Sequence, residues 1–180
     1  MKALFNFFPA RQVCYHCRRT LCRLTRRDIA VRHAGGPGES STAMIKEIVK
    51  DAEFLSQPAE PATAEDAQVG EDLVDTMRTA EAACLAANQI GSRKAVIAYN
   101  DNGRTFVMYN PHLDSGLQRF STVEECLSLD EPSVVERFKM IRVSYEILAG
   151  GKLEKRTRKF TGWAAQAVQH AIDHCEGKLV

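Results

Sequence analysis

Two histidines and one cysteine in the C-terminal part of the chain have the residue types and spacing to hold a metal ion. His170 and His174 stand four positions apart, so on an α-helix they project from one face and can hold a single cation. Cys126 is the candidate third ligand from a separate segment. One thiolate and two imidazoles suit Zn²⁺ or Fe²⁺ and leave a fourth position for water, as in catalytic sites. The alternatives are a buried core thiol and a chance pair of surface histidines.

Two helices are predicted, and the second positions the histidines. The pattern predicts a helix over 161–176, with Gly177 as its C-terminal stop. Apolar residues at three- and four-residue spacing predict an earlier amphipathic helix over 64–87. A short entry segment over 45–55 precedes it and ends at a proline-containing loop.

Short β-rich runs lie between the two helices. Residues 93–98 and 105–110 predict a hairpin, because Asn102-Gly103 between them is a strong turn signal. Pro111 is predicted to end the second strand. Further strands are expected at 121–127 and at 139–148, with a turn at Gly150-Gly151. Strands between helices, with no internal repeat, predict an α+β domain.

The composition divides the chain into two pieces. The 180 residues are 44% apolar and 26% charged, which suits one globular domain, and no apolar run approaches the roughly 18 residues of a membrane span. Residues 1–43 carry eight basic and two acidic side chains, a net charge of +6. Residues 44–180 carry 16 basic and 21 acidic side chains, a net charge of −5. We therefore expect a basic N-terminal extension over 1–43 and one domain over 44–180.

Several interpretations of the extension stay open. The preferred one is a mis-assigned translation start, with Met44 as the native first residue, because a small-residue linker over 34–43 separates the two pieces. A disordered extension, a transit peptide and a basic nucleic-acid-binding arm are alternatives, although nucleic-acid binding is not the expectation. A metal knuckle is a further one, and its ligands would be Cys14, His16, Cys17, Cys22 and His33.

Three ordered segments of the domain carry a resemblance to a known family. They read A-A-C-L-A-A-N-Q at 82–89, E-E-C-L-S at 124–128 and Q-H-A-I-D-H at 169–174. These resemble the peptide deformylase motifs G-x-G-L-A-A-x-Q, E-G-C-L-S and Q-H-E-x-D-H, in order and at similar spacing. The resemblance implies a deformylase-like fold, with antiparallel or mixed sheets packed around a central C-terminal metal-binding helix.

The resemblance also implies a function and a site. Deformylases remove the N-terminal formyl group from the methionine of nascent polypeptides with one divalent metal, commonly Fe²⁺, with Zn²⁺ or Ni²⁺ as alternatives. Cys126, His170 and His174 would be the ligands, and the metal would activate water for attack on the formyl carbon. The side chain of Gln89 and the backbone N–H of Leu127 would stabilise the oxyanion.

The same resemblance gives lesser roles and a cellular setting. Asp173 would be a structural partner of the ligands, and Leu85 would line the methionine pocket or belong to the core. The expected partner is an N-formylmethionyl or other N-terminal peptide. The expected place is the cytoplasm, near the ribosome and away from membranes, where free thiols persist.

Three positions depart from the family pattern. Ala171 stands where the family has its acid–base glutamate, and losing such a group typically costs about 10²–10⁴ in rate. Cys84 and Glu125 replace motif glycines, so both side chains would narrow the peptide groove. Cys84 would otherwise be an extra soft ligand or a redox-sensitive thiol. Glu125 is a candidate substitute base, and its alternative is a solvated surface acid, because Cys126 beside it must face the metal.

Three functional hypotheses follow from these departures. The preferred one is a metal-binding deformylase-like protein whose activity is lost or strongly impaired. The second is an active metallohydrolase that uses a substitute base such as Glu125. The third is a non-catalytic peptide-binding or structural metal protein.

Overall fold

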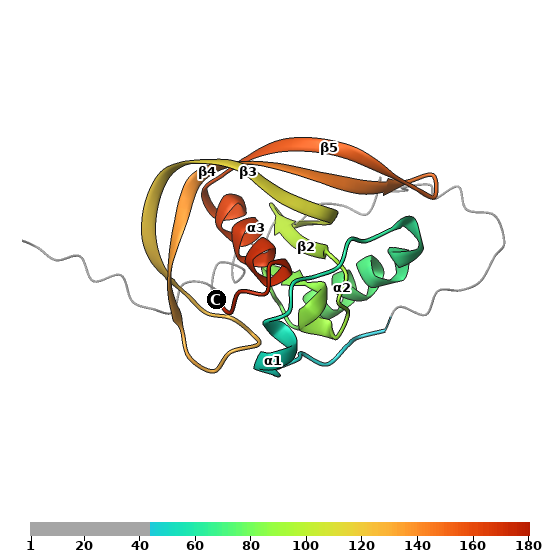
Figure 1. Ribbon diagram of the computed structural model, residues 1–180, viewed down its shortest axis with the longest axis horizontal. Helices are drawn as coiled ribbons and strands as arrows, with labels where there is room; N and C mark the ends of the chain where they lie inside the picture. Colours follow the sequence, from blue (N-terminus) through green and yellow to red (C-terminus); the bar gives the residue numbers. More distant parts are fainter. Residues whose placement is uncertain (1–43) are drawn as a thin grey trace, which may run out of the picture. The chain divides into compact units, whose positions relative to one another are not determined.

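A computed structural model describes residues 44–180, whose framework is a five-stranded antiparallel sheet (Figure 1). The interpretations of residues 1–43 lie outside the described residues. Each strand pairs with its neighbours in the chain. The strands are β1 (Cys84–Ala86), β2 (Val96–Asp101), β3 (Arg104–Glu124), β4 (Ser133–Ala149) and β5 (Lys152–Thr161). With the helices described below, this sheet confirms the predicted α+β class.

Both predicted turns are present. Asn102 and Gly103 have φ values of 53° and 79° and join β2 to β3. Positive φ at both central residues gives the backbone twist that suits a two-residue hairpin. Gly150 and Gly151, with φ values of 56° and 75°, join β4 to β5 in the same way.

β3 and β4 are longer than the sequence predicts, and two predictions are wrong. The separate strand expected at 121–127 is the end of β3, which stops at Glu124. Pro111 does not end a strand, because β3 continues through it to Glu124. The pairing of β3 with β4 shifts register between Tyr109 and His112, so the missing N–H of Pro111 falls at an irregularity of the ladder. β4 begins at Ser133 instead of position 139. The sequence pattern predicts no strand over the basic residues that form β5.

The first predicted helix is correct at its start and too long at its end. A 3-10 turn, η1 (Ala64–Asp66), leads into α2 (Ala67–Thr79), and the side chain of Thr63 caps the start. The left-handed backbone of Glu81, with φ 51°, follows α2 and turns the chain away. Residues 84–86 therefore pair as β1 instead of continuing the helix. A one-turn helix, α1 (Ala52–Leu55), lies in the entry segment.

The second predicted helix is confirmed within one residue at each end as α3 (Gly162–Cys175). Gly177 adopts φ 74° just beyond it, as the sequence predicts for a helix stop. A side chain at position 177 would meet the backbone carbonyl of Ser56, so a residue with no Cβ is needed there. No helix within 44–180 is long and apolar enough to span a membrane.

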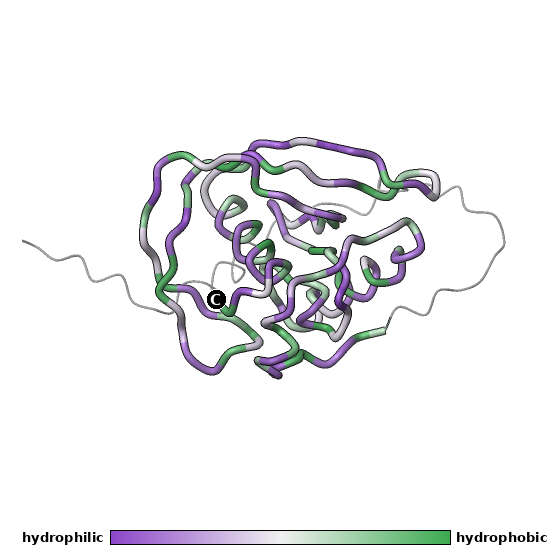
Figure 2. Tube along the Cα trace, in the orientation of Figure 1, coloured by the Kyte–Doolittle hydropathy of each residue, from purple (hydrophilic) through white to green (hydrophobic). Residues whose placement is uncertain are grey.

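β2 separates two apolar clusters because its side chains alternate between them. Ile97 and Tyr99 pack in the cluster that includes α3, while Val96 and Ala98 pack in the cluster that includes α2. Figure 2 shows that hydrophilic residues dominate β5, whereas hydrophobic residues recur along α3 in the interior. α3 is therefore held against the sheet by a core, which fixes the histidines that it carries.

Candidate metal centre

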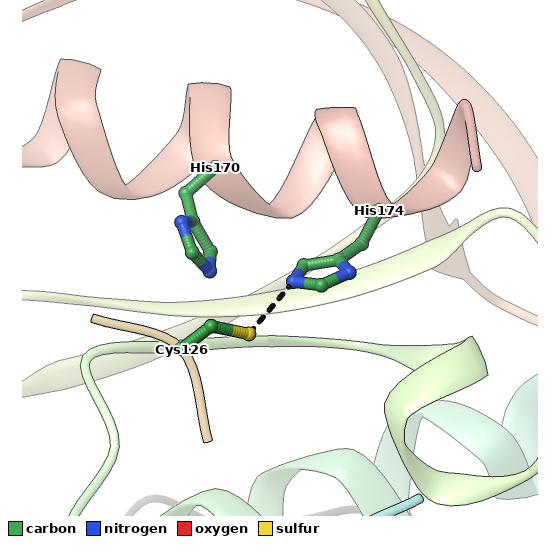
Figure 3. Close-up of side chains that lie close together, drawn as sticks. All are labelled: Cys126, His170 and His174. Carbon is green, nitrogen blue, oxygen red and sulfur yellow. Dashed lines mark hydrogen bonds between the residues drawn. The ribbon is translucent and has the colours of Figure 1, made fainter. Parts of the chain in front are cut away.

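Cys126, His170 and His174 lie together in the folded chain. One ligand atom from each of them falls within 4.8 Å of the other two, and all three residues are buried. Figure 3 shows both imidazoles projecting from α3 toward the thiol, which lies in the loop after β3. Nε2 of His174 is 3.2 Å from Sγ of Cys126. The structure thus brings together the three side chains that the sequence predicts as ligands.

His170 is oriented by a buried chain of charged groups. Its Nδ1 lies 2.9 Å from a carboxylate oxygen of Glu124, the last residue of β3. Arg137 on β4 donates two hydrogen bonds to the same carboxylate, of 2.9 and 2.8 Å, and a third of 2.6 Å to Asp173 on α3. Because Nδ1 is engaged by Glu124, Nε2 of His170 remains for the cluster.

The electrostatics of the cluster favour a thiolate. Burial alone would raise the pKa of the Cys126 thiol, but hydrogen bonds from His170 and His174 outweigh burial and lower this pKa to about 6. Burial alone would lower the pKa of His170, but hydrogen bonds with Cys126 and Glu124 raise this pKa to about 9. The thiolate is the form of cysteine that binds metals. The donor types therefore fit a divalent cation, which would meet a thiolate at Cys126 and would release the proton of His170, because the neutral imidazole is the form that binds metals.

Gln89 is the other predicted site residue that the fold brings to the cluster. Its side chain is buried on η2 (Ala87–Ile90), and its Nε2 lies 3.5 Å from Sγ of Cys126 and 3.2 Å from Oγ of Ser128. Oε1 accepts from the backbone N–H of Ala86 at 3.0 Å, which directs the amide donor toward the thiol. Leu127, the second predicted donor, follows Cys126 directly and its side chain is 44% exposed.

The positions that depart from the motifs lie in different surroundings. Ala171 is fully buried in the apolar cluster of α3, between the two histidines in sequence. Glu125 is exposed. Cys84 is partly buried beside the same cluster, and burial raises the pKa of its thiol to about 12, so this thiol is neutral. Leu85 is fully buried in the cluster of α2, which places it in the core.

Sequence patterns alone predict no role for Glu124 or Arg137, although both support the site. Glu124 stands in the second motif, two positions before Cys126, and this proximity is the signal that was available. Arg137 gives no such signal, because its partners lie 13 and 36 positions away along the chain.

Comparison with known proteins identifies the family. The family model for polypeptide deformylase matches residues 45–180. The chain belongs to the peptide deformylase family. The deformylase of Clostridium beijerinckii is 37% identical over 139 residues, which cover 76% of this chain and 100% of that protein. The deformylase of Heliobacterium modesticaldum is 34% identical, and the match covers 75% and 91% of the two chains.

Solved deformylases share the fold. The crystal structure of the deformylase from Thermus thermophilus superposes with a TM-score of 0.68 at 29% identity, covering 76% of this chain and 84% of the other. A class I type b deformylase from Acinetobacter baumannii with bound Met-Ala-Ser superposes with a TM-score of 0.67 at 26% identity, covering 76% and 97%. Membership of the deformylase family implies a single metal ion, and Cys126, His170 and His174 form the cluster that fits it.

Replacing one of the three predicted ligands should abolish metal binding. We expect His174→Ala to retain no stoichiometric zinc or nickel after dialysis, because two remaining donors bind weakly. The matched control is His112→Ala, since His112 is an exposed histidine on β3. Elemental analysis of both variants and the wild type checks this. Full metal content in His174→Ala would contradict the ligand set.

Removing Arg137 should destabilise the chain far more than removing an exposed arginine. Arg137→Met leaves Glu124 charged and buried, and we expect the free energy of unfolding to fall by about 3–5 kcal/mol. Arg156→Met removes an exposed ion pair with Glu154 and should cost less than about 1 kcal/mol. Urea unfolding of the metal-free variants measures both values. Equal losses of unfolding free energy in the two variants would show that the buried ion pairs stabilise the fold no more than the exposed one.

Proposed function

We propose that this chain is a deformylase-family metalloprotein that binds one divalent cation and peptide N-termini but has lost most or all deformylase activity. The observation that carries the proposal is the buried methyl group of Ala171 at the position where the family resemblance places the acid–base glutamate. The cation would be held by Cys126, His170 and His174. Iron is the metal that the family resemblance favours, with zinc or nickel as substitutes.

A bound cation would supply a Lewis acid for water and for a carbonyl oxygen. The residues around it retain several parts of a hydrolytic site. Gln89 directs an amide donor toward the cluster, where it would stabilise an oxyanion. The side chain of Glu124 holds the ring of His170 in place. These parts bind and orient a substrate, but none of them transfers a proton.

Proton transfer is the step that the described residues do not support. Among residues 44–180, the carboxylate that contacts a ligand side chain is Glu124. Burial alone would raise its pKa, but hydrogen bonds from His170 and Arg137 lower this pKa to about 2. A carboxylate with so low a pKa is a weak base at neutral pH. Asp173 is held by Arg137 and Lys178. Neither acid therefore replaces the missing glutamate.

The competing proposal is an active hydrolase that uses Glu125 as its base. Glu125 is exposed and next to Cys126 in sequence, and its carboxylate has the surroundings of a solvated surface acid. A base must lie within hydrogen-bonding reach of the proton that it accepts, directly or through one water. The exposure of Glu125 and the burial of the cluster disfavour this alternative.

The proposed ligand is a peptide N-terminus that carries methionine. The bound Met-Ala-Ser of the Acinetobacter baumannii deformylase supports this choice. A cytoplasmic site of action near the ribosome, where such N-termini first appear, belongs to the same proposal. A reducing compartment suits the thiol of Cys126, which is free in the structure.

Restoring the glutamate should restore turnover. We expect Ala171→Glu to raise kcat/KM for a formyl-methionyl peptide by about 10²–10⁴-fold, because a positioned acid–base group is worth that much. The apolar surroundings of position 171 would raise the pKa of the new carboxyl toward neutrality, which suits proton transfer. The assay uses anaerobically prepared protein loaded with Fe²⁺ or Ni²⁺ at matched metal content.

Ala171→Gln is the matched control, because glutamine has nearly the same size as glutamate but lacks a carboxyl group that can accept and donate a proton. It should remain as slow as the wild type. Wild-type turnover equal to that of Ala171→Glu would contradict the proposal. If neither variant gains activity, we expect that the side chains of Glu125 and Cys84 narrow the peptide groove. Glu125→Gly or Cys84→Gly should then recover deformylase activity in the Ala171→Glu background.

A further inference from the structure

Two buried polar atoms lack a hydrogen-bond partner among the described residues, and they belong to two residues that contact each other. They are Nδ1 of His174 and Oδ1 of Asn88. The residues are 0% and 3% exposed. The two residues are in contact, since Nδ2 of Asn88 donates to the backbone carbonyl of His174 at 2.7 Å. Buried polar atoms are usually paired, so two unpaired atoms on residues that contact each other need an explanation.

The chemistry of His174 makes its Nδ1 a donor when a cation is bound. Nε2 faces the cluster, 3.2 Å from Sγ of Cys126, so a cation would take the lone pair of Nε2. The ring proton of a neutral imidazole then lies on Nδ1. The other histidine differs at this point, because Nδ1 of His170 is already engaged by Glu124 at 2.9 Å.

The chemistry of Asn88 makes its free atom an acceptor. The carbonyl oxygen of His174 only accepts, so the amide nitrogen of Asn88 must face it. This fixes the carboxamide and leaves Oδ1 as the unpaired end. The unpaired donor of one residue thus matches the unpaired acceptor of the other.

We propose that Asn88 is a positioning residue for the metal centre, whose Oδ1 accepts the Nδ1 proton of His174 through one buried water. This link fixes the tautomer of the imidazole and holds Nε2 toward the cation, as Glu124 does for His170. Buried waters commonly bond to polar groups that protein atoms leave unpaired. The inference rests on the metal site of the proposed function.

Zinc affinity tests this role without an activity assay. Chelator competition should show that Asn88→Ala binds Zn²⁺ about 10–100-fold more weakly than the wild type. The matched control is Asn110→Ala, since Nδ2 of Asn110 donates to the carbonyl of Ala62 at 2.9 Å, in a different part of the domain. It should lose stability and keep its zinc affinity.

The tautomer gives a second readout that a purely structural role would not move. Heteronuclear NMR of the zinc-loaded wild type should show a slowly exchanging proton on Nδ1 of His174, and this signal should exchange faster in Asn88→Ala. An unprotonated Nδ1 in the wild type would overturn the inference even if Asn88→Ala does not fold. Equal zinc affinity of the wild type and Asn88→Ala would also overturn it, while leaving the metal site intact. A wild type that binds no zinc would overturn the metal site and the inference together.

Discussion

The guanidinium of Arg137 lies buried between two carboxylates, Glu124 at the end of β3 and Asp173 on α3. A buried charge must be paired, because an unpaired one loses its hydration without compensation. This requirement ties β3, β4 and α3 to one point. The same Glu124 carboxylate orients the ring of His170, so the constraint that joins helix and sheet also sets the direction of a proposed metal ligand.

In the proposed function, metal binding and proton transfer depend on different residues. The cluster of thiol and imidazoles is positioned by α3, by the loop after β3 and by the Arg137 ion pairs, and none of these needs a glutamate at position 171. Ala171 packs in the core of α3, where a methyl group costs no desolvation. Under the proposed function, the chain therefore keeps its metal donors while lacking the proton carrier. This separation is the physical basis of the proposed function.

The sequence predicts the parts of the fold that local chemistry controls. Both hairpin turns and the end of α3 need backbone with positive φ, which glycine adopts at little cost. The residues there are Asn102-Gly103, Gly150-Gly151 and Gly177. The three motifs of the family also identify the residues that meet at the cluster. Their meeting is confirmed, and their role as ligands stays a prediction.

Contacts between residues far apart in the sequence determine the features that local sequence patterns do not predict. The continuation of β3 through Pro111 depends on its partner β4, and Cys84 belongs to a strand because it pairs with Tyr99 of β2. The strongly basic β5 is a strand because β4 lies beside it. The buried role of Glu124, in contrast to the exposed Glu125, needs the distant Arg137 and His170. These partners lie 13 and 46 positions away from Glu124 along the chain, so the local sequence pattern around Glu124 does not reveal them.

The central claim is that this chain binds metal without efficient hydrolysis. The most direct measurement determines iron content and hydrolysis of formyl-Met-Ala-Ser on one anaerobic sample, with the Clostridium beijerinckii deformylase prepared in parallel. We expect a full equivalent of iron in both proteins and a kcat/KM about 10²–10⁴-fold lower for this chain. Equal kcat/KM at equal iron content would contradict it.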